Sequence, residues 1–327
     1  MEFLTILITL ALLQLWGSGG PIQRDEWLQS VIESVVTWTD SSGLRLFAII
    51  IGPCILLLLF LWSVDTMLFG LFSFIVYLGV LLYSLGRGEF NETIQRYLNA
   101  WGSGNFAEAK KYALNLGETL KSESEFEPGA DIYVSPNVSA SADAGSTSSD
   151  HVEQSKGDDS RLHGESYQSV HECVRTAILY EGFERWFAVI FWFLALGPIG
   201  ALAYRLSQNC ARSEILCEED SQLALRVVHY LDWIPARLLA LAFALTGNFV
   251  SSFEFYWQSL WEDNSVADVI EKSALAAITF TTGKKEDTDD EESFRISGRQ
   301  EISALQALLS RSAVCWVAII ALFELFF

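Results

Sequence analysis

Basic residues are scarce in this sequence, which has 21 Lys and Arg against 41 Asp and Glu and a formal net charge of −20. A surface that binds nucleic acid needs clustered Lys and Arg to neutralise phosphates. The composition therefore argues against nucleic acid as a partner. Most of the acidic residues fall in two polar segments, which favours solvated, flexible chain there.

The sequence also lacks the patterns of common catalytic and metal sites. Gly283–Lys285 is not a phosphate loop, because the upstream glycine and the following Ser or Thr are missing. There is no H-E-x-x-H, no nucleophile elbow and no metal-spaced His/Cys cluster. The five cysteines form no C-x-x-C pair, and an odd number closes no disulfide framework. We therefore predict no catalytic residue, no cofactor and no metal.

Long apolar runs dominate what is present. Three of them, residues 46–64, 66–85 and 186–204, are long enough to cross a bilayer, which takes about 20 apolar residues. The shorter run 312–327 predicts a C-terminal transmembrane segment. Residues 3–16 predict an uncleaved helix in or at the membrane, because the basic start of a signal peptide is missing. We expect an all-α polytopic membrane protein, with the lipid bilayer as a partner.

The first two long runs predict a tight transmembrane hairpin, since only Asp65 separates them. The turn around Asp65 has no Lys or Arg, whereas basic residues follow from Arg87 onward. By the positive-inside rule, the turn faces the periplasm and the chain after Arg87 faces the cytoplasm. The N-terminus then lies outside if residues 3–16 cross.

Composition shifts divide the remaining chain. Helical periodicity on both sides of a break at 102–105 predicts a cytoplasmic helical hairpin. Ser, Asp, Gly and Glu then dominate a predicted flexible, disordered insertion, and order resumes at Ser166. The predicted units are an N-terminal helix with a transmembrane hairpin (1–86), the cytoplasmic hairpin (87–121), the insertion (122–166), a membrane core (167–250), a charged acidic connector (251–311) and the C-terminal segment (312–327).

Residues 227–249 form a strongly apolar helix with two possible placements. It could span the membrane with its polar residues turned inward, or pack as a buried helix against the other spans. Either placement puts Asp232 and Arg237 in the protein interior, where charge must be paired. We expect Arg237 to pair with Asp232 or with a glutamate near 181–184. Asn248 is expected to cap this helix or to contact a ligand.

Further candidates for ligand or partner binding lie beside the apolar runs. Arg87, between two glycines and followed by Glu89, either binds lipid phosphate or a ligand carboxylate, or acts as a stop-transfer charge. On the helix that leads into the third run, the charged residues form either a polar cluster that holds an anionic ligand or ordinary surface ion pairs. These helix candidates are His171, Arg175, Glu181, Glu184 and Arg185.

Three segments together resemble the AmpE family of membrane proteins associated with β-lactamase regulation. They are Leu82–Glu89, Arg185–Arg205 and Leu231–Leu238. The resemblance implies a multi-pass protein of the bacterial inner membrane that acts in regulatory signalling. It also implies a link to cell-wall fragment recycling, with a cell-wall-derived small molecule or a regulatory protein as a partner.

Phe191-Trp192, Gly197 to Arg205 and Pro235 to Leu238 also look like the CobD/CbiB family. Those membrane enzymes form an amide bond during cobalamin biosynthesis. The resemblance implies an alternative function, an amide-bond-forming membrane enzyme with an unknown substrate. The family has a Glu-Asn pair before the apolar span, but the Asn is missing from Tyr180–Arg185. This departure speaks against amide synthesis.

Overall fold

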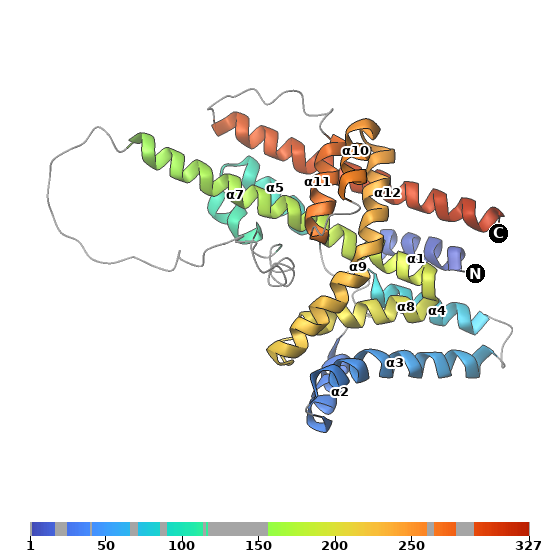
Figure 1. Cartoon of the computed structure of the whole chain (residues 1–327). Helices are drawn as coiled ribbons and strands as arrows, with labels where there is room; N and C mark the ends of the chain where they lie inside the picture. The colour runs from blue at the N-terminus through green and yellow to red at the C-terminus, as the bar shows by residue number, and fades with distance from the viewer. Residues whose placement is uncertain are drawn as a thin grey trace, which may run out of the picture.

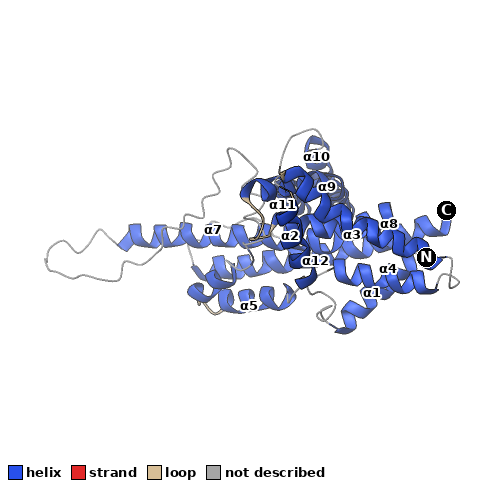
Figure 2. Cartoon of the chain, turned by 90° about the horizontal axis from the view of Figure 1, so that it is seen from below, coloured by secondary structure: helices blue, strands red, loops and turns tan. Residues whose placement is uncertain are grey.

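The computed structural model describes residues 2–16, 25–39, 41–65, 71–85, 90–113, 116, 156–259, 265–278 and 291–326. Every regular element in these ranges is helical, which confirms the predicted all-α class (Figure 2). The helices are α1 (Glu2–Trp16), α2 (Glu26–Trp38), α3 (Ser42–Asp65), α4 (Leu71–Ser84), α5 (Phe90–Gly102), α7 (Lys156–Gly182), the π-helix η1 (Phe183–Ala188), α8 (Val189–Ala211), α9 (Glu218–Thr246), α10 (Phe249–Ser259), α11 (Val266–Ile278) and α12 (Glu291–Phe326).

A bundle of apolar helices forms one half of the molecule. In Figure 1, α1, α3, α4, α8 and the C-terminal half of α12 run side by side, and α8 contacts α1, α3 and α4. Four described stretches, 43–63, 168–211, 218–246 and 292–326, are long and apolar enough to cross a membrane, and α1 and α4 are shorter apolar helices. Large apolar side chains on α3 and α12 point outward, as lipid contact requires. The chain is a polytopic membrane protein.

The apolar run 186–204 reverses direction instead of crossing in one pass. Glu184 and Arg212 form an ion pair, although 28 residues of straight helix would separate them by about 42 Å. The reversal lies at Gly197, whose φ of 68° and ψ of −156° suit glycine almost alone. A Cβ at Gly200 would lie 2.3 Å from the Trp192 carbonyl oxygen, so the turn is tight. The third predicted span is therefore a re-entrant helical hairpin with arms 183–196 and 198–211.

Helix α9 runs across the bundle rather than along it (Figure 1). It packs against α8, α10, α11 and α12. In its most apolar stretch of 18 residues 56% is buried, whereas in the corresponding stretch of α12 only 11% is buried. The helix is also long and apolar enough to span, and Trp233, Ile234 and Leu245 on its outer face are exposed, so it combines features of both placements open from the sequence. Asp232 and Arg237 are buried, as predicted, with 0% and 4% of their surface exposed.

The opposite half of the molecule, which we call the head, contains α5 and the first turns of α7 (Figure 2). A turn at 103–104 follows α5, and 106–113 are helical again, so the predicted helix–break–helix pattern is present. Helix α7 begins at Lys156, ten residues before Ser166, where we expected order to resume. No proline lies between Lys156 and Gly182, so the backbone permits this extension of the helix. Residues 122–155 lie outside the described residues.

The segment predicted as a charged connector, 251–311, contains most of α10, all of α11 and the first half of α12. Buried apolar residues such as Ile270, Ala274 and Ile302 recur at helical spacing between its charges, which explains these helices. The predicted C-terminal segment 312–327 is the second half of α12. The acidic run 286–290 lies outside the described residues.

Candidate functional site

A set of polar side chains gathers where the two arms of the re-entrant hairpin meet α9. We call it the hairpin-base cluster. It consists of Tyr180, Glu181, Glu184, Arg185, Tyr204, Arg205, Gln208, Arg212 and Asp232. Because the chain doubles back at Gly197, residues nearly thirty positions apart in the sequence become neighbours.

Asp232 is the most deeply buried charged group of this cluster. Its Oδ1 accepts a 2.6 Å hydrogen bond from Tyr204, and its Oδ2 accepts a 3.1 Å hydrogen bond from Tyr180. A buried carboxylate is costly unless several donors satisfy it. One hydroxyl group comes from the end of α7, just before the first arm, and the other from the second arm, so Asp232 ties both sides of the hairpin to α9.

Two ion pairs form the accessible rim of the cluster. Arg185 pairs with Glu181 at 2.9 Å, as the four-residue spacing predicts, and Arg212 pairs with Glu184. The side chains of Arg185 and Arg212 are 21% and 32% exposed, whereas both glutamates are buried. Burial opposes the charge on Arg212, but the Glu184 carboxylate outweighs it and raises the pKa of this guanidinium. The rim therefore presents two accessible arginines above buried acids.

Arg205 lies behind this rim and is only 7% exposed. Its Nη1 donates a 2.9 Å hydrogen bond to Gln208, which in turn donates to the Tyr204 hydroxyl at 2.9 Å. Its Nε has no hydrogen-bond partner among the described residues. A buried guanidinium with an unused donor is a ready binding group for an acceptor such as a carboxylate.

The π-helix η1 follows α7, forms the start of the first arm of the hairpin and contains Glu184 and Arg185. π-Helical turns are rare and occur often at functional sites, because the wider turn shifts the side chains that follow. Here the π-helix begins at Phe183, two residues after Glu181, so it helps to set the directions of Glu184 and Arg185. Arg185 also lies over the ring of Phe90, 4.9 Å from its centre, which links the cluster to the start of α5.

Arg237 is buried, as predicted, and stacks on Trp233. Its guanidinium lies 4.0 Å from the centre of the Trp233 ring, and its Nη1 donates to the Trp233 carbonyl oxygen at 3.2 Å. Stacking on indole is a favourable setting for a desolvated cation. Asn248 lies at the start of α10, where its side chain donates to Ser251 at 2.7 Å. It therefore belongs to a helix end and not to the hairpin-base cluster.

His171 and Arg175 form a second polar site in the head, which we call the head network. Arg175 donates to Glu271 at 2.7 Å and to Glu301 at 3.1 Å, and His171 lies 3.5 Å from Glu301. This network joins α7 to α11 and α12. Its members Arg175 and His171 lie about 9 Å and about 15 Å along the helix from Glu181, and they contact other partners, so the candidates on this helix divide into two separate sites.

Tyr97 and Trp101 of α5 cover the head network. The Tyr97 hydroxyl is 3.3 Å from Nδ1 of His171, and the Trp101 ring centre is 5.2 Å from that of the imidazole. Burial, together with the neighbouring Cys173 and Glu301, raises the pKa of Tyr97, so its hydroxyl stays protonated. The head network thus lies in a packed contact between four helices, α5, α7, α11 and α12.

Sequence reasoning missed Tyr180 on α7, and it missed Tyr204, Arg205, Gln208 and Arg212 beyond the reversal. The signal that could have found the latter four is Gly197-Pro198, which marks the reversal that brings them to the cluster. Arg87 and Glu89 lie outside the described residues. Within the described ranges, no group of three or more His, Cys, Asp or Glu side chains could hold a metal ion.

Comparison with known proteins matches residues 1–123 and 142–322 to the family described as regulatory signalling modulator protein AmpE. A curated relative, the cobalamin biosynthesis protein CobD of Stutzerimonas stutzeri (strain A1501), is 28% identical over 116 residues. This match covers 33% of the chain and only 38% of that relative's length. No solved structure matches the chain. Because the AmpE match covers nearly the whole chain, both arms of the hairpin and α9 included, the protein belongs to the AmpE family of regulatory signalling modulators.

Proposed function

We propose that this protein is a sensor in the bacterial inner membrane that binds a small anionic cell-wall fragment at the hairpin-base cluster. Binding would be coupled to β-lactamase induction through a regulatory protein. Membership of the AmpE family supports the regulatory role. The charge distribution of the cluster supports an anionic ligand, because its arginines are more accessible than its acids.

The observation that carries this proposal is the unused donor of Arg205. Its Nε is buried without a hydrogen-bond partner among the described residues, close behind the accessible Arg212. A ligand carboxylate that enters between Arg185 and Arg212 would displace Glu184 from Arg212 and accept from Arg205. The gain is a charge-assisted hydrogen bond that the free protein does not make. Displacement of Glu184 would also move η1, which leads into α7 and the head.

In the experiment, a muramyl tripeptide is titrated into the purified full-length protein in detergent, and isothermal titration calorimetry measures the affinity. We expect saturable binding that Arg205→Gln weakens at least tenfold, which is about 1.4 kcal/mol. The control is Arg226→Gln, which removes an exposed arginine from α9 and should leave the affinity unchanged. Equal weakening by both variants, or the absence of saturable binding, would contradict the proposal.

The similarity to CobD supports a second candidate function, amide-bond formation with ATP. On this proposal the two substrates, an amine and an acid, would bind at the hairpin-base cluster, where Glu181 or Glu184 would act on one of them. The distinguishing measurement is ATP turnover by the purified protein with candidate amine–acid pairs. Turnover that Glu184→Gln abolishes would favour the enzyme, and binding without turnover favours the sensor.

A further inference from the structure

Helix α9 contacts three apolar segments of the bundle, each at the end that faces the head. Close to its start, Asp220 forms a 3.2 Å ion pair with Arg45, which directly precedes the apolar part of α3. In its middle, Asp232 accepts hydrogen bonds at the base of the re-entrant hairpin. Close to its end, the Thr246 hydroxyl lies 2.9 Å from that of Ser312, where the apolar half of α12 begins. The start, the middle and the end of α9 therefore all lie on the head side of the bundle (Figure 1).

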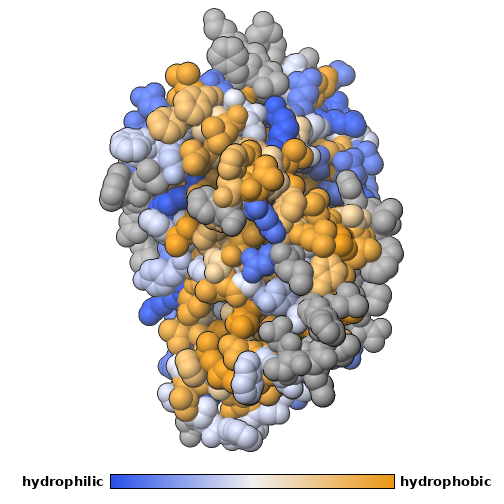
Figure 3. Space-filling view, turned by 90° about the vertical axis from the view of Figure 1, so that its right-hand side faces the viewer, coloured by the Kyte–Doolittle hydropathy of each residue, from blue (hydrophilic) through white to orange (hydrophobic). Residues whose placement is uncertain are grey.

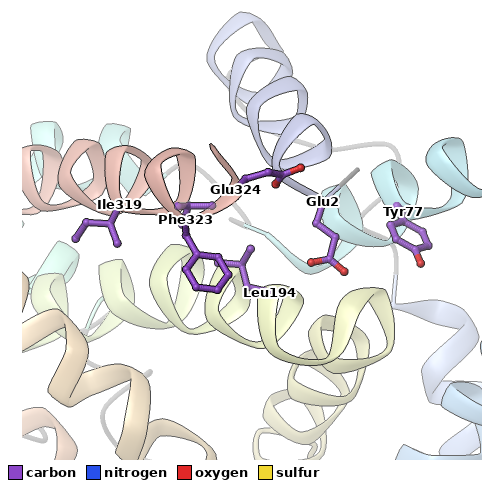
Figure 4. Close-up of a pocket in the computed structure, with 7 residues that line it drawn as sticks. Glu2, Tyr77, Leu194, Ile319, Phe323 and Glu324 are labelled. Carbon is purple, nitrogen blue, oxygen red and sulfur yellow. The ribbon is translucent and has the colours of Figure 1, made fainter. Parts of the chain in front are cut away.

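The opposite end of the bundle is formed by other helices. A pocket there is lined by residues of α1, α4, the first arm of the hairpin and α12, among them Glu2, Tyr77, Leu194 and Phe323 (Figure 4). Figure 3 views the molecule from this end, where apolar side chains cover much of the visible surface. With 29 residues, α9 is about 44 Å long, which is enough to reach from one end of the bundle to the other. Its three polar contacts instead keep its whole length near the head.

The outer face of α9 is apolar along most of its length. Four of its large apolar side chains recur at spacings of four and seven residues, so they share one face of the helix. They are Tyr230, Ile234, Leu238 and Leu245, and their exposed fractions run from 38% to 73%. We call this face the α9 stripe. The other side of the helix packs on the bundle, where Phe243 is fully buried.

Helix α10 continues the exposed apolar surface directly after α9. The Phe249 and Phe253 rings stack with their centres 5.1 Å apart, and the Trp257 ring follows 6.5 Å from Phe253. All three rings are exposed, by 49%, 38% and 60%. Aromatic side chains of this kind are enriched where a membrane protein meets the lipid headgroups.

We propose that α9 and α10 lie in the head-side interface of the membrane, with the α9 stripe and the rings of α10 inserted into the lipid. The occupant is lipid because this surface is continuous with an established lipid contact: α9 packs against α3 and α12, whose exposed apolar side chains already face the bilayer. An amphipathic helix in this position buries its apolar face about 5–10 Å into the boundary between headgroups and acyl chains. The inference does not depend on any ligand of the hairpin-base cluster.

The test measures the depth of spin labels on the full-length protein in phosphatidylcholine nanodiscs. In a background without native cysteines, Ile234→Cys and Leu245→Cys place labels on one face of α9, about 16 Å apart along the helix. Collision rates with oxygen and with a water-soluble nickel complex give the depths. We expect depths that differ by less than half of this distance, both shallower than that of Leu56→Cys in the middle of α3. A depth difference close to the full distance would show that α9 crosses the membrane and would overturn the proposal.

A matched pair of labels tests α10. Phe253→Cys lies on the aromatic face, whereas Gln258→Cys lies on a different, polar side of the same helix and is also exposed. The label at 253 should collide mainly with oxygen, and the label at 258 mainly with the nickel complex. Equal access of the nickel complex to both positions would contradict the insertion of α10.

A measurement on the otherwise native chain applies if the cysteine-free protein does not fold. Trp233 lies near the middle of α9 and is 43% exposed. The fluorescence that is lost in Trp233→Phe should be quenched more strongly by phosphatidylcholine brominated near the headgroup than by phosphatidylcholine brominated near the chain end. The reverse order would place the middle of α9 at the bilayer centre, as in a crossing helix, and would refute the interfacial position.

Discussion

Tyr204 donates a 2.6 Å hydrogen bond to Asp232, a carboxylate with no exposed surface, while Tyr180 donates to its other oxygen. The two tyrosines lie on opposite sides of the reversal at Gly197, and Asp232 lies on α9. The carboxylate thereby holds three segments in one arrangement. Such a bond stabilises only if it is complete, because a buried charge that loses a donor keeps its desolvation cost.

Tyr204→Phe should lower the free energy of unfolding by about 1.5–3 kcal/mol, the usual contribution of a hydrogen bond to a charged group. Denaturant unfolding in mild detergent measures the change. Tyr230→Phe is the control, because Tyr230 is largely exposed on α9, and it should alter stability by less than about 0.5 kcal/mol. Equal effects of the two variants would show that Asp232 does not depend on Tyr204.

The ion pair between Glu184 and Arg212 predicts a charge-exchange effect. Glu184→Gln should destabilise the protein by about 2 kcal/mol, less than for a fully buried pair because Arg212 reaches solvent. The double variant Glu184→Arg/Arg212→Glu, in which the two charges are exchanged, should be more stable than Glu184→Arg alone. Thermal unfolding of Glu184→Arg, Arg212→Glu and the double variant measures the coupling, and strictly additive effects would mean that the pair contributes nothing.

Gly197 predicts a contrast between two glycines of the bundle. Gly197→Val should cost about 1–3 kcal/mol and reduce the folded yield, because a branched residue is strained at positive φ. Gly79→Ala on α4 should be tolerated, since a Cβ there meets no atom within 4 Å and alanine favours helix. Fluorescence-detected size exclusion in detergent compares the yields. A well-folded Gly197→Val protein would contradict the described reversal.

The re-entrant hairpin makes a prediction about sidedness. In a background without native cysteines, Gln168→Cys and Glu214→Cys should react with a membrane-impermeant maleimide from the same side of the membrane. Trp62→Cys near the far end of α3 should react from the opposite side. Labelling of right-side-out and inverted vesicles shows from which side of the membrane each cysteine reacts. Reaction of 168 and 214 from different sides would establish a single crossing instead.

The head network predicts a difference between buried and exposed ion pairs. Arg175→Gln should destabilise the protein by about 2 kcal/mol, because Glu271 would lose its ionic partner and Glu301 would keep only His171, and both carboxylates are partly buried. Lys272→Gln removes the exposed partner of Asp268 and should cost less than about 0.5 kcal/mol. Urea unfolding of both variants measures the difference. Similar small effects would show that the network is fully solvated.

The helical class and the burial of Asp232 and Arg237 were predictable, because long uncharged runs leave few alternatives to helices in lipid. The reversal at Gly197 was not. Apolar composition reports whether a segment can enter a membrane, but it carries no information about the direction in which the segment leaves. Gly197-Pro198 is visible in the sequence, yet such pairs are also tolerated in kinked spanning helices.

The candidate site was predictable only where its partners are close in sequence. The four-residue spacing of Glu181 and Arg185 predicted their ion pair, which the structure contains. Arg212 was missed because its partner is 28 residues away across the hairpin. The contact of Arg237 with the adjacent indole ring of Trp233 was not predicted, since sequence reasoning considers charge partners before aromatic rings.

Helix α12 has 36 residues, which corresponds to about 54 Å of continuous helix. Near one end, Glu301 lies in the head network, and near the other, Glu324 lines a pocket together with Glu2 of α1. The described residues of this rod contain no proline hinge. A displacement of α12 along its own axis therefore moves both of its ends together. A movement at the head network would in this way be transmitted to the opposite end of the bundle.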